Sequence, residues 1–332
     1  MWSFLLRAFM VLYIPLPPPL PLWRPYNPNF EESTNREEEE EGEANGNHEE
    51  VPVGEHDDDR VLVIDGKLQS AESDEFIYHE SLVHPALLLH HSPKTVFIMG
   101  GGEGSTAREV LKHRDIEKAV MCDIDRVVVE FCRSHLTANE AAFNDERLQI
   151  VFNDAKAELE SRRDYQNEKF DVIIGDLGDP LEGGPCNHLY TKSFYGNVIK
   201  PILNHRGIFV TQAGPAGILT HKDIFTTIYN TLIHVFNYVI AYTAHVPSYA
   251  DSCGWVLASA EPLNLNVEEI ESRIRDRITG ELRYLDAAFI VSSTVLNKTL
   301  RTSLLNETHI YTEENARFIH GCGVFNNNSS DV

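Results

Sequence analysis

Cysteine, positive charge and long uninterrupted apolar runs are all scarce in this 332-residue chain. The five cysteines include no Cys-x-x-Cys pair and are odd in number, which disfavours a zinc site or a disulfide framework and indicates reduced thiols in a cytoplasmic protein. Only 28 Lys and Arg residues stand against 51 Asp and Glu residues, so the formal net charge is −23. Such an excess of negative charge disfavours a nucleic-acid partner and is compatible with a cationic substrate.

The most apolar stretch, Trp2 to Leu22, is interrupted by Arg7 and by five prolines. It is too broken for a membrane-spanning helix, and its pattern is not that of a secretory signal. Thirteen of the 23 net negative charges lie in 31–59, a composition typical of a disordered acidic linker. We therefore expect residues 1–60 to be a disordered proline-rich and acidic segment, residues 326–332 to be a disordered tail, and the membrane not to be a partner.

The stretch that decides the interpretation runs from Thr95 to Asp125. The apolar run 96–99 predicts a buried strand that breaks into Gly-Gly-Gly-Glu-Gly at 100–104, and a helix begins near Ser105. Glycine accepts positive φ and lets a ligand approach the backbone, so this turn suits a ligand held at a helix N-terminus. A second apolar strand ends in Asp123, where Rossmann-like folds place a carboxylate on ribose hydroxyls.

Glu103 distinguishes this turn from a phosphate-binding loop. The spacing is Gly-x-Gly-x-Gly rather than the dinucleotide Gly-x-Gly-x-x-Gly, and a carboxylate would repel the phosphates of NAD or ATP. We expect Glu103 to face a ligand whose non-nucleoside arm is positively charged. A simple glycine turn with a solvated glutamate is the alternative.

The chain beyond residue 60 predicts a hairpin and helix over 61–95, followed by an α/β core over 96–325. The hairpin turns at Asp65-Gly66, and the helix begins at Ser73 or Asp74. The core strands are predicted at 96–99, 119–122, 148–154, 170–176, 207–213, 238–247 and 254–260. Helices separate all but the last two, which should form an antiparallel edge hairpin on a parallel sheet. This is the Rossmann-like sheet of the S-adenosylmethionine methyltransferases, preceded by a small β-hairpin remnant, with further helices over 265–320.

Four consecutive predicted strands deliver acidic residues to one edge of this sheet. Ligands of open parallel sheets bind beyond the carboxyl ends of the strands. Those ends carry the 100–104 turn, Asp123, Asp154, the pair Asp176 and Asp179, and Gln212. Any one of these aspartates could be only a helix cap, but all of them together are not expected to be. The sequence therefore predicts a nucleoside pocket that continues into an acidic trench.

In these residues the chain resembles the polyamine aminopropyltransferases, the family of the spermidine, spermine and thermospermine synthases. The resemblance covers roughly residues 61–325. Its motifs are D-G-K-L-Q-S-A-E-S-D-E-F-I-Y-H-E (65–80), G-G-G-E-G (100–104), C-D-I-D (122–125), N-D-A (153–155), G-D-L-G-D-P (175–180) and H-V-P-S-Y (245–249). The glutamate of G-G-G-E-G and the run G-G-P-C-N-H-L-Y-T-K-S-F-Y (183–195) look most like the plant thermospermine synthases.

The resemblance implies that the aminopropyl group of decarboxylated S-adenosylmethionine moves to spermidine, giving thermospermine and methylthioadenosine. It implies a co-substrate rather than a permanent cofactor, and no metal. In the implied donor site Asp123 binds the ribose and Asp154 the adenine edge. Glu103 binds the aminopropyl ammonium with help from Gln69 and His79, and Gly100, Gly102, Gly104, Ala155 and Asp176 complete the site. In the implied acceptor site Asp176 accepts the amine proton, Tyr78 and Asp179 position the amine, and Gln212 and Tyr249 line the trench.

Other interpretations stay open from the sequence. The chain could be a spermidine or spermine synthase with a different acceptor, or an inactive nucleoside-binding partner of an active relative. A methyltransferase is disfavoured, because ordinary S-adenosylmethionine carries a carboxylate where Glu103 would lie. Tyr78 and Tyr249 could be core aromatics, His79 a satisfied helix histidine and Asp176 a structural acid. The family begins with a small β-domain for which residues 1–60 show no counterpart, which leaves activity and a homo-oligomer open.

Overall fold

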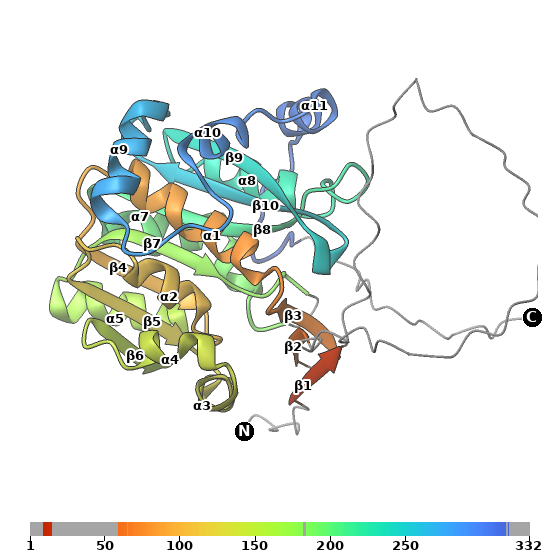
Figure 1. Ribbon diagram of the computed structural model, residues 1–332. Coiled ribbons are helices and arrows are strands. Elements are labelled where there is room, and N and C mark those ends of the chain that lie inside the picture. Colours follow the sequence, from red (N-terminus) through yellow and green to blue (C-terminus); the bar gives the residue numbers. More distant parts are fainter. Residues whose placement is uncertain (1–8, 15–58, 65, 182–183, 317, 319–332) are drawn as a thin grey trace, which may run out of the picture.

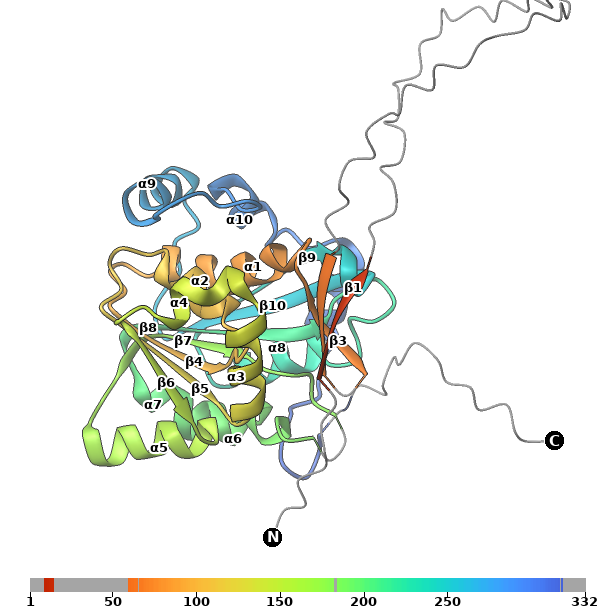
Figure 2. The same ribbon diagram turned by 60° about the horizontal axis from the view of Figure 1, so that its bottom comes forward.

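The computed structural model describes residues 9–14, 59–64, 66–181, 184–316 and 318. A three-stranded sheet and a seven-stranded sheet organise this part of the chain, and helices cover both faces of the larger sheet (Figures 1 and 2). Among the helices of these residues, none combines the length and the apolar character needed to cross a bilayer.

The strands are β1 (Phe9–Ile14), β2 (Asp59–Ile64), β3 (Lys67–Ala71), β4 (Thr95–Gly100), β5 (Lys118–Asp123), β6 (Leu148–Phe152), β7 (Phe170–Asp176), β8 (Leu203–Pro215), β9 (Tyr238–Val246) and β10 (Asp251–Ser259). The α-helices are α1 (Glu75–Leu89), α2 (Ser105–Leu111), α3 (Arg126–His135), α4 (Glu140–Phe143), α5 (Ala155–Gln166), α6 (Lys192–Phe194), α7 (Lys200–Ile202), α8 (Phe225–Ile233), α9 (Val267–Arg277), α10 (Ala287–Ser292) and α11 (Lys298–Asn306). Short 3₁₀ turns η1 (Thr137–Asn139), η2 (Asn187–Tyr190) and η4 (Pro247–Tyr249) and a π turn η3 (Tyr195–Ile199) connect them.

The larger sheet has the strand order β6-β5-β4-β7-β8-β10-β9. Neighbours from β6 to β8 pair in parallel, whereas β10 is antiparallel to both β8 and β9. The predicted Rossmann-like fold with an antiparallel edge hairpin is therefore confirmed, with β10 inserted between β8 and β9. Strand order reverses between β4 and β7, which is where open α/β sheets bind their ligands.

The apolar run of β4 shows why the central strands look continuously hydrophobic in the sequence. Val96 and Ile98 pack into the core cluster that includes residues of α1, α2, α9 and α10. Phe97 and Met99 point to the opposite face, where the cluster includes residues of α5, α6, α8 and α11. Because both faces of the strand are buried, alternation between polar and apolar side chains disappears. Figure 2 shows the two helical layers, with α1, α2, α9 and α10 together on one side of the sheet.

The small sheet has the order β1-β2-β3 and corrects one expectation from the sequence. No strand was predicted before Val61, yet β1 pairs antiparallel with β2 from Phe9 opposite Ile64 to Ile14 opposite Asp59. The run F-M-V-L-Y-I has the β-branched and aromatic composition that strands favour, and the β2–β3 hairpin offers it an edge. The remainder of the segment predicted as disordered, 1–8 and 15–58, lies outside the described residues, as does the predicted tail 326–332.

The small sheet is attached next to the carboxyl ends of the core strands. Leu62 of β2 packs with Val128 and Cys132 of α3, the helix that follows β5. From the other side, the hydroxyl of Tyr249 in η4 donates a hydrogen bond to the backbone oxygen of Gln69 in β3. The hairpin predicted from the sequence therefore covers the edge of the sheet where the site was expected.

Candidate active site

The glycine turn between β4 and α2 is pressed against the ends of two neighbouring strands. Gly100, Gly101 and Gly104 have positive φ values of 77°, 72° and 94°. The amide of Gly101 donates to the backbone oxygen of Asp176 at 3.2 Å. A Cβ atom at Gly100 would lie 2.2 Å from that same oxygen, so only glycine fits there. The turn thus brings α2 directly to the end of β7.

Asp123, at the end of β5, is held by the same turn. One carboxylate oxygen accepts from the amide of Gly102 at 3.0 Å and the other from the amide of Asp125 at 2.7 Å. Burial raises the pKa of Asp123, although these two amide bonds oppose the rise. The cap of α3 is Asp125, which accepts from the amides of Val127 and Val128. Asp123 is therefore a fixed acceptor beside the turn, and its predicted contact with ribose hydroxyls stays a prediction.

Asp176, at the end of β7, is oriented by hydroxyl groups from two different helices. Tyr78 of α1 donates to one carboxylate oxygen at 3.2 Å, and Thr106 of α2 donates to the other at 2.6 Å. Burial and the charge of Asp176 raise the pKa of Tyr78 well above its usual value, so the phenol stays protonated and remains a donor. The tyrosine ring also packs on Trp255, at 5.6 Å between centroids. Tyr78 thus packs its ring into the core and at the same time donates a hydrogen bond to Asp176.

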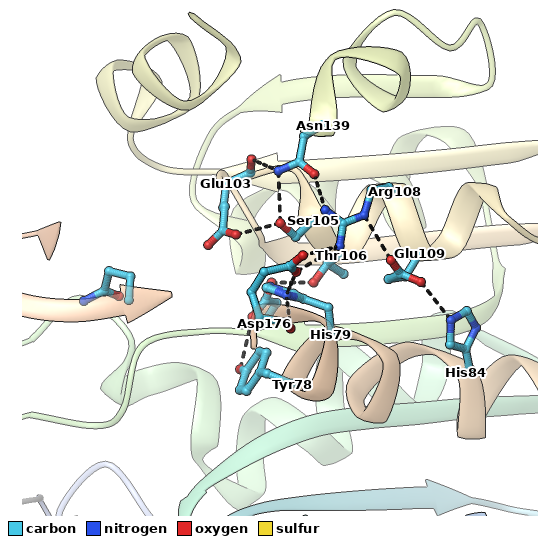
Figure 3. A network of polar contacts seen from close by, with 12 residues as sticks. Tyr78, His79, His84, Glu103, Ser105, Thr106, Arg108, Glu109, Asn139 and Asp176 are labelled. Carbon is cyan, nitrogen blue, oxygen red and sulfur yellow. Dashed lines mark hydrogen bonds and ion pairs between the residues drawn. The ribbon is translucent and has the colours of Figure 1, made fainter. Parts of the chain in front are cut away.

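Glu103 lies next to a buried histidine (Figure 3). Ser105 donates to the Glu103 carboxylate at 2.6 Å, and Nδ1 of His79 donates to the carboxylate of Glu75 at 2.7 Å. Burial disfavours the imidazolium, but the hydrogen bond to Glu75 and the negative charges of Glu103 and Asp176 raise the pKa of His79 to about 9. His79 therefore lies in the field of both Glu103 and Asp176.

The three groups Glu75, His79 and Glu103 are compact enough to surround a cation. One ligand atom from each lies within 4.8 Å of the others. Both oxygens of Glu75, however, already accept from the guanidinium of Arg108, at 2.8 and 2.9 Å. A cation that donates hydrogen bonds, such as an alkylammonium, suits this arrangement better than a metal ion that needs several free oxygen ligands.

Asp154 combines a capping role with a half-buried position just beyond the end of β6. One carboxylate oxygen accepts from the amide of Ala157 at 2.9 Å and caps α5, whose first residue is Ala155. The other lies 3.2 Å from Nε2 of His188. Asp154 thus caps α5, and the predicted contact with adenine stays a prediction.

Asp179 and Tyr249, two of the predicted acceptor residues, are both partly buried. Burial raises the pKa of Asp179 to about 6, although the side-chain amide of Gln212 and the charge of Lys67 oppose the rise. The ring of Tyr249 stands perpendicular to that of Tyr78, with 6.2 Å between centroids. Burial and the charges of Glu103 and Asp176 raise the pKa of Tyr249 well above its usual value.

Two predicted site residues, Gln212 and Gln69, direct their side-chain hydrogen bonds to other groups of the protein. The amide nitrogen of Gln212 donates to the backbone oxygen of Leu177 and to the Tyr190 hydroxyl, both at 2.7 Å, and its oxygen accepts from Gly214 at 2.7 Å. Gln212 therefore fixes the loop after β7. Gln69 donates from its side chain to the oxygen of Lys67 at 3.1 Å.

Sequence reasoning missed several residues that hold the site together. Thr106 could have been found, since it lies in the first turn of the helix that follows the glycines. Glu75 and Arg108 lie 33 residues apart on different helices, and nothing in the spacing of their apolar neighbours indicates that they meet. Asn139, in a short turn, gave no signal either.

Comparison with known families agrees with this geometry. The profile of the spermine/spermidine synthase domain matches residues 75–269. The chain is 64% identical over 265 residues to thermospermine synthase ACAULIS5 of Arabidopsis thaliana, with 80% of this chain and 77% of that protein covered. It is 44% identical over 265 residues to a polyamine aminopropyltransferase of Aeropyrum pernix, with 78% and 82% covered.

Solved structures give the same relationship. Spermidine synthase from Thermotoga maritima matches with a TM-score of 0.66 and 31% identity, covering 75% of this chain and 81% of that one. A spermidine synthase in complex with the transition-state analogue AdoDATO matches with a TM-score of 0.67 and 32% identity, covering 75% and 82%.

Proposed function

The chain belongs to the spermine/spermidine synthase family, and from this premise and the geometry above we propose how it acts. It is an aminopropyltransferase that moves the aminopropyl group of decarboxylated S-adenosylmethionine to spermidine, giving thermospermine and methylthioadenosine. The donor is a co-substrate that leaves as product. The observation that carries the mechanism is the Asp176 carboxylate, held by Tyr78 and Thr106 at the strand end that the glycine turn contacts.

In the donor half of the site, we assign the nucleoside to the strand ends and the charged arm to Glu103. Asp123 accepts the ribose hydroxyls, and Asp154 with the start of α5 faces the adenine. Glu103 attracts the aminopropyl ammonium and repels the carboxylate that ordinary S-adenosylmethionine carries at this position. Selection of the decarboxylated donor is then a matter of charge.

His79 completes the binding of the donor ammonium. Its Nδ1 donates to Glu75, so the neutral ring carries its lone pair on Nε2. In that form Nε2 accepts a hydrogen bond from the ammonium. A protonated ring would instead repel the donor, so donor binding displaces a proton from His79.

In the acceptor half, the attacking amine must be neutral. An alkylammonium with a pKa near 10.4 costs about 4–5 kcal/mol to deprotonate at pH 7. A carboxylate alone favours the charged amine, so the neighbouring sulfonium and desolvation must supply the difference. As the new C–N bond forms, the C–S bond breaks and its electron pair stays on sulfur. The proton of the amine then passes to Asp176.

The remaining acceptor residues shape the trench and orient the polyamine in it. Asp179 and Tyr78 position the reacting nitrogen, and Tyr249 lines the trench that takes the rest of the polyamine. Gln212 acts on the acceptor indirectly, through the loop 177–179 that it holds in place. The acidic character of the trench suits a polycation.

The function is tested by incubating the full chain with decarboxylated S-adenosylmethionine and each of putrescine, spermidine and spermine. We expect release of methylthioadenosine with spermidine and a product that co-elutes with thermospermine. Preferred turnover of putrescine, or a product that co-elutes with spermine, would assign another acceptor or product. Folded protein that releases no methylthioadenosine would favour the inactive-partner alternative.

We also propose a cytoplasmic location and a homo-oligomeric assembly. The first is supported by the free thiols of Cys122, Cys132, Cys186 and Cys253, which suit a reducing compartment. The second is supported by the small sheet, which presents edge strands to a second copy. Imaging of a fluorescent fusion and light scattering of the purified chain test the two proposals.

A further inference from the structure

Arg108 lies in the middle of the polar network that Figure 3 shows, yet its role is not evident from the predicted site. Its Nη2 donates to both oxygens of Glu75, at 2.8 and 2.9 Å. Nη1 donates to the side chain of Asn139 at 2.7 Å, and Nε donates to Glu109 at 3.0 Å. One guanidinium thus binds three separate partners from α1, η1 and its own helix.

Two of these contacts lead to the groups that surround the proposed donor ammonium. Through Glu75, Arg108 fixes the carboxylate that accepts from His79. Through Asn139, it fixes an amide group that donates to the backbone oxygen of Glu103 and to the hydroxyl of Ser105, each at 3.0 Å. Ser105 in turn donates to the Glu103 carboxylate at 2.6 Å. The two sides of the ammonium site therefore meet at one side chain.

The third contact, to Glu109, anchors the guanidinium of Arg108 on the side away from the proposed ligand. Glu109 is 1% exposed and binds Nε2 of His84 at 3.0 Å and the ammonium of Lys112 at 2.7 Å. Nδ1 of His84 lies 2.9 Å from Nε2 of His113. This end of the network runs away from the proposed ligand and holds Arg108 in one position.

We infer that Arg108 is a positioning residue for the donor's aminopropyl arm, which sets the distance between Glu103 on one side and Glu75 with His79 on the other. The inference rests on the proposed function. Arg108 does not itself touch the donor, because its nitrogens are directed to the three protein partners. Its planar fork binds Glu75 and Asn139 through two different nitrogens in fixed directions, whereas lysine offers one nitrogen on a flexible stem. Replacing Arg108 by lysine removes the fork and keeps the positive charge. Glu103 and Glu75 are then held less firmly around the donor ammonium.

The test compares two ligands that share the methylthioadenosine part and differ in the arm and in the sulfonium charge that its attachment creates. Decarboxylated S-adenosylmethionine carries the aminopropyl ammonium, and methylthioadenosine carries the same nucleoside without it. We expect Arg108→Lys to raise the dissociation constant of the donor about tenfold, since a misplaced binding group loses much of its contribution. Binding of methylthioadenosine should remain that of the unmodified chain. Asn139→Ala, which removes the branch from Arg108 to Glu103 and Ser105 but leaves the contact with Glu75, should act in the same direction.

Arg147→Lys is the matched control. Arg147 also uses its fork, for Asp145 at 2.7 Å and for the backbone oxygens of Leu111 at 2.9 Å and His113 at 3.3 Å, and none of these partners belongs to the proposed donor site. This variant is expected to lose stability and to keep the ratio of the two affinities. If Arg108→Lys weakens both ligands equally, or neither, Arg108 is only structural and the inference is wrong. The unmodified chain is assayed for turnover in parallel, so a failure of the proposed function is seen separately.

Discussion

At the scale of single residues, the proposed chemistry depends most on Asp176. Asp176→Asn keeps the shape but removes the proton acceptor, so kcat should fall by about 10²–10⁴. Tyr78→Phe loses one orienting hydrogen bond, and we expect roughly a tenfold loss. Steady-state assays of methylthioadenosine release give both values. Binding of methylthioadenosine should change much less than kcat in either variant.

Asp171 provides a control on the same strand. It lies at the opposite end of β7, where one oxygen accepts from the amides of Lys94 and Thr95 at 2.8 and 3.0 Å. Asp171→Asn should therefore lower stability and preserve kcat. An Asp176→Asn enzyme that keeps more than about a tenth of the activity would exclude Asp176 as the proton acceptor.

His79 predicts a pH dependence that is specific to the donor. Its pKa of about 9 means that the free enzyme carries an imidazolium at pH 7. Binding of a cationic donor to Glu103 releases that proton, so donor affinity should rise between pH 7 and 9, by at most about tenfold per pH unit. Above the pKa of His79 the rise should stop. Calorimetric titration at several pH values measures this.

Two comparisons isolate the histidine. In His79→Gln the donor affinity should not change between pH 7 and 9. The affinity for methylthioadenosine should not depend on pH in this variant or in the unmodified chain. His221, which is buried against Ser303 at 2.9 Å, offers a remote control, and His221→Gln should leave the pH dependence intact. A flat profile for the unmodified chain would mean that His79 is neutral or distant from the donor.

At the scale of elements, we expect the glycine turn not to tolerate alanine at Gly100. The reason is the close approach of another strand rather than backbone strain alone. Gly100 and Gly280 both have positive φ, so alanine costs about 1–2 kcal/mol at either position. At Gly280 nothing lies within 4 Å of the added Cβ, whereas at Gly100 the Asp176 oxygen lies at 2.2 Å. Gly100→Ala must therefore displace the end of β7. It should lose more stability than Gly280→Ala and most of its activity, as measured by urea unfolding and kcat.

The same pair of variants tests the coupling between turn and strand. If Gly100→Ala and Gly280→Ala lose equal stability and both keep activity, the backbone of Asp176 moves freely and the turn does not position it. The stated geometry predicts activity loss in the first variant alone.

Elements also show what the sequence could and could not predict. The apolar strands and the glycine turn were predictable, because burial on both faces of β4 and positive φ each leave a local signature. β1 was missed because prolines and glutamates dominate the composition around it. The position of β10 between β8 and β9 has no local signature, since hydropathy gives strands but not their order.

The candidate site divides in the same way. Glu103, Asp123 and Asp176 follow apolar strands directly and could be predicted from that position alone. Arg108, Asn139 and Glu75 could not, because their contacts depend on how α1, η1 and α2 pack. Gln212 was predicted to line the acceptor trench, but its side-chain amide donates to Leu177 and Tyr190, which the sequence around it does not indicate.

At the scale of the whole molecule, the net charge of −23 predicts a salt dependence for cationic substrates. Opposite charges attract spermidine over about 10 Å at 0.1 M salt but only about 3 Å at 1 M. We expect kcat/KM for spermidine to fall about tenfold over this range, because both encounter and binding are screened. Inhibition by uncharged methylthioadenosine should change little and controls for effects of salt on folding. A kcat/KM that is independent of salt would show that recognition of the polyamine rests on contacts at the trench rather than on the field of the acidic protein.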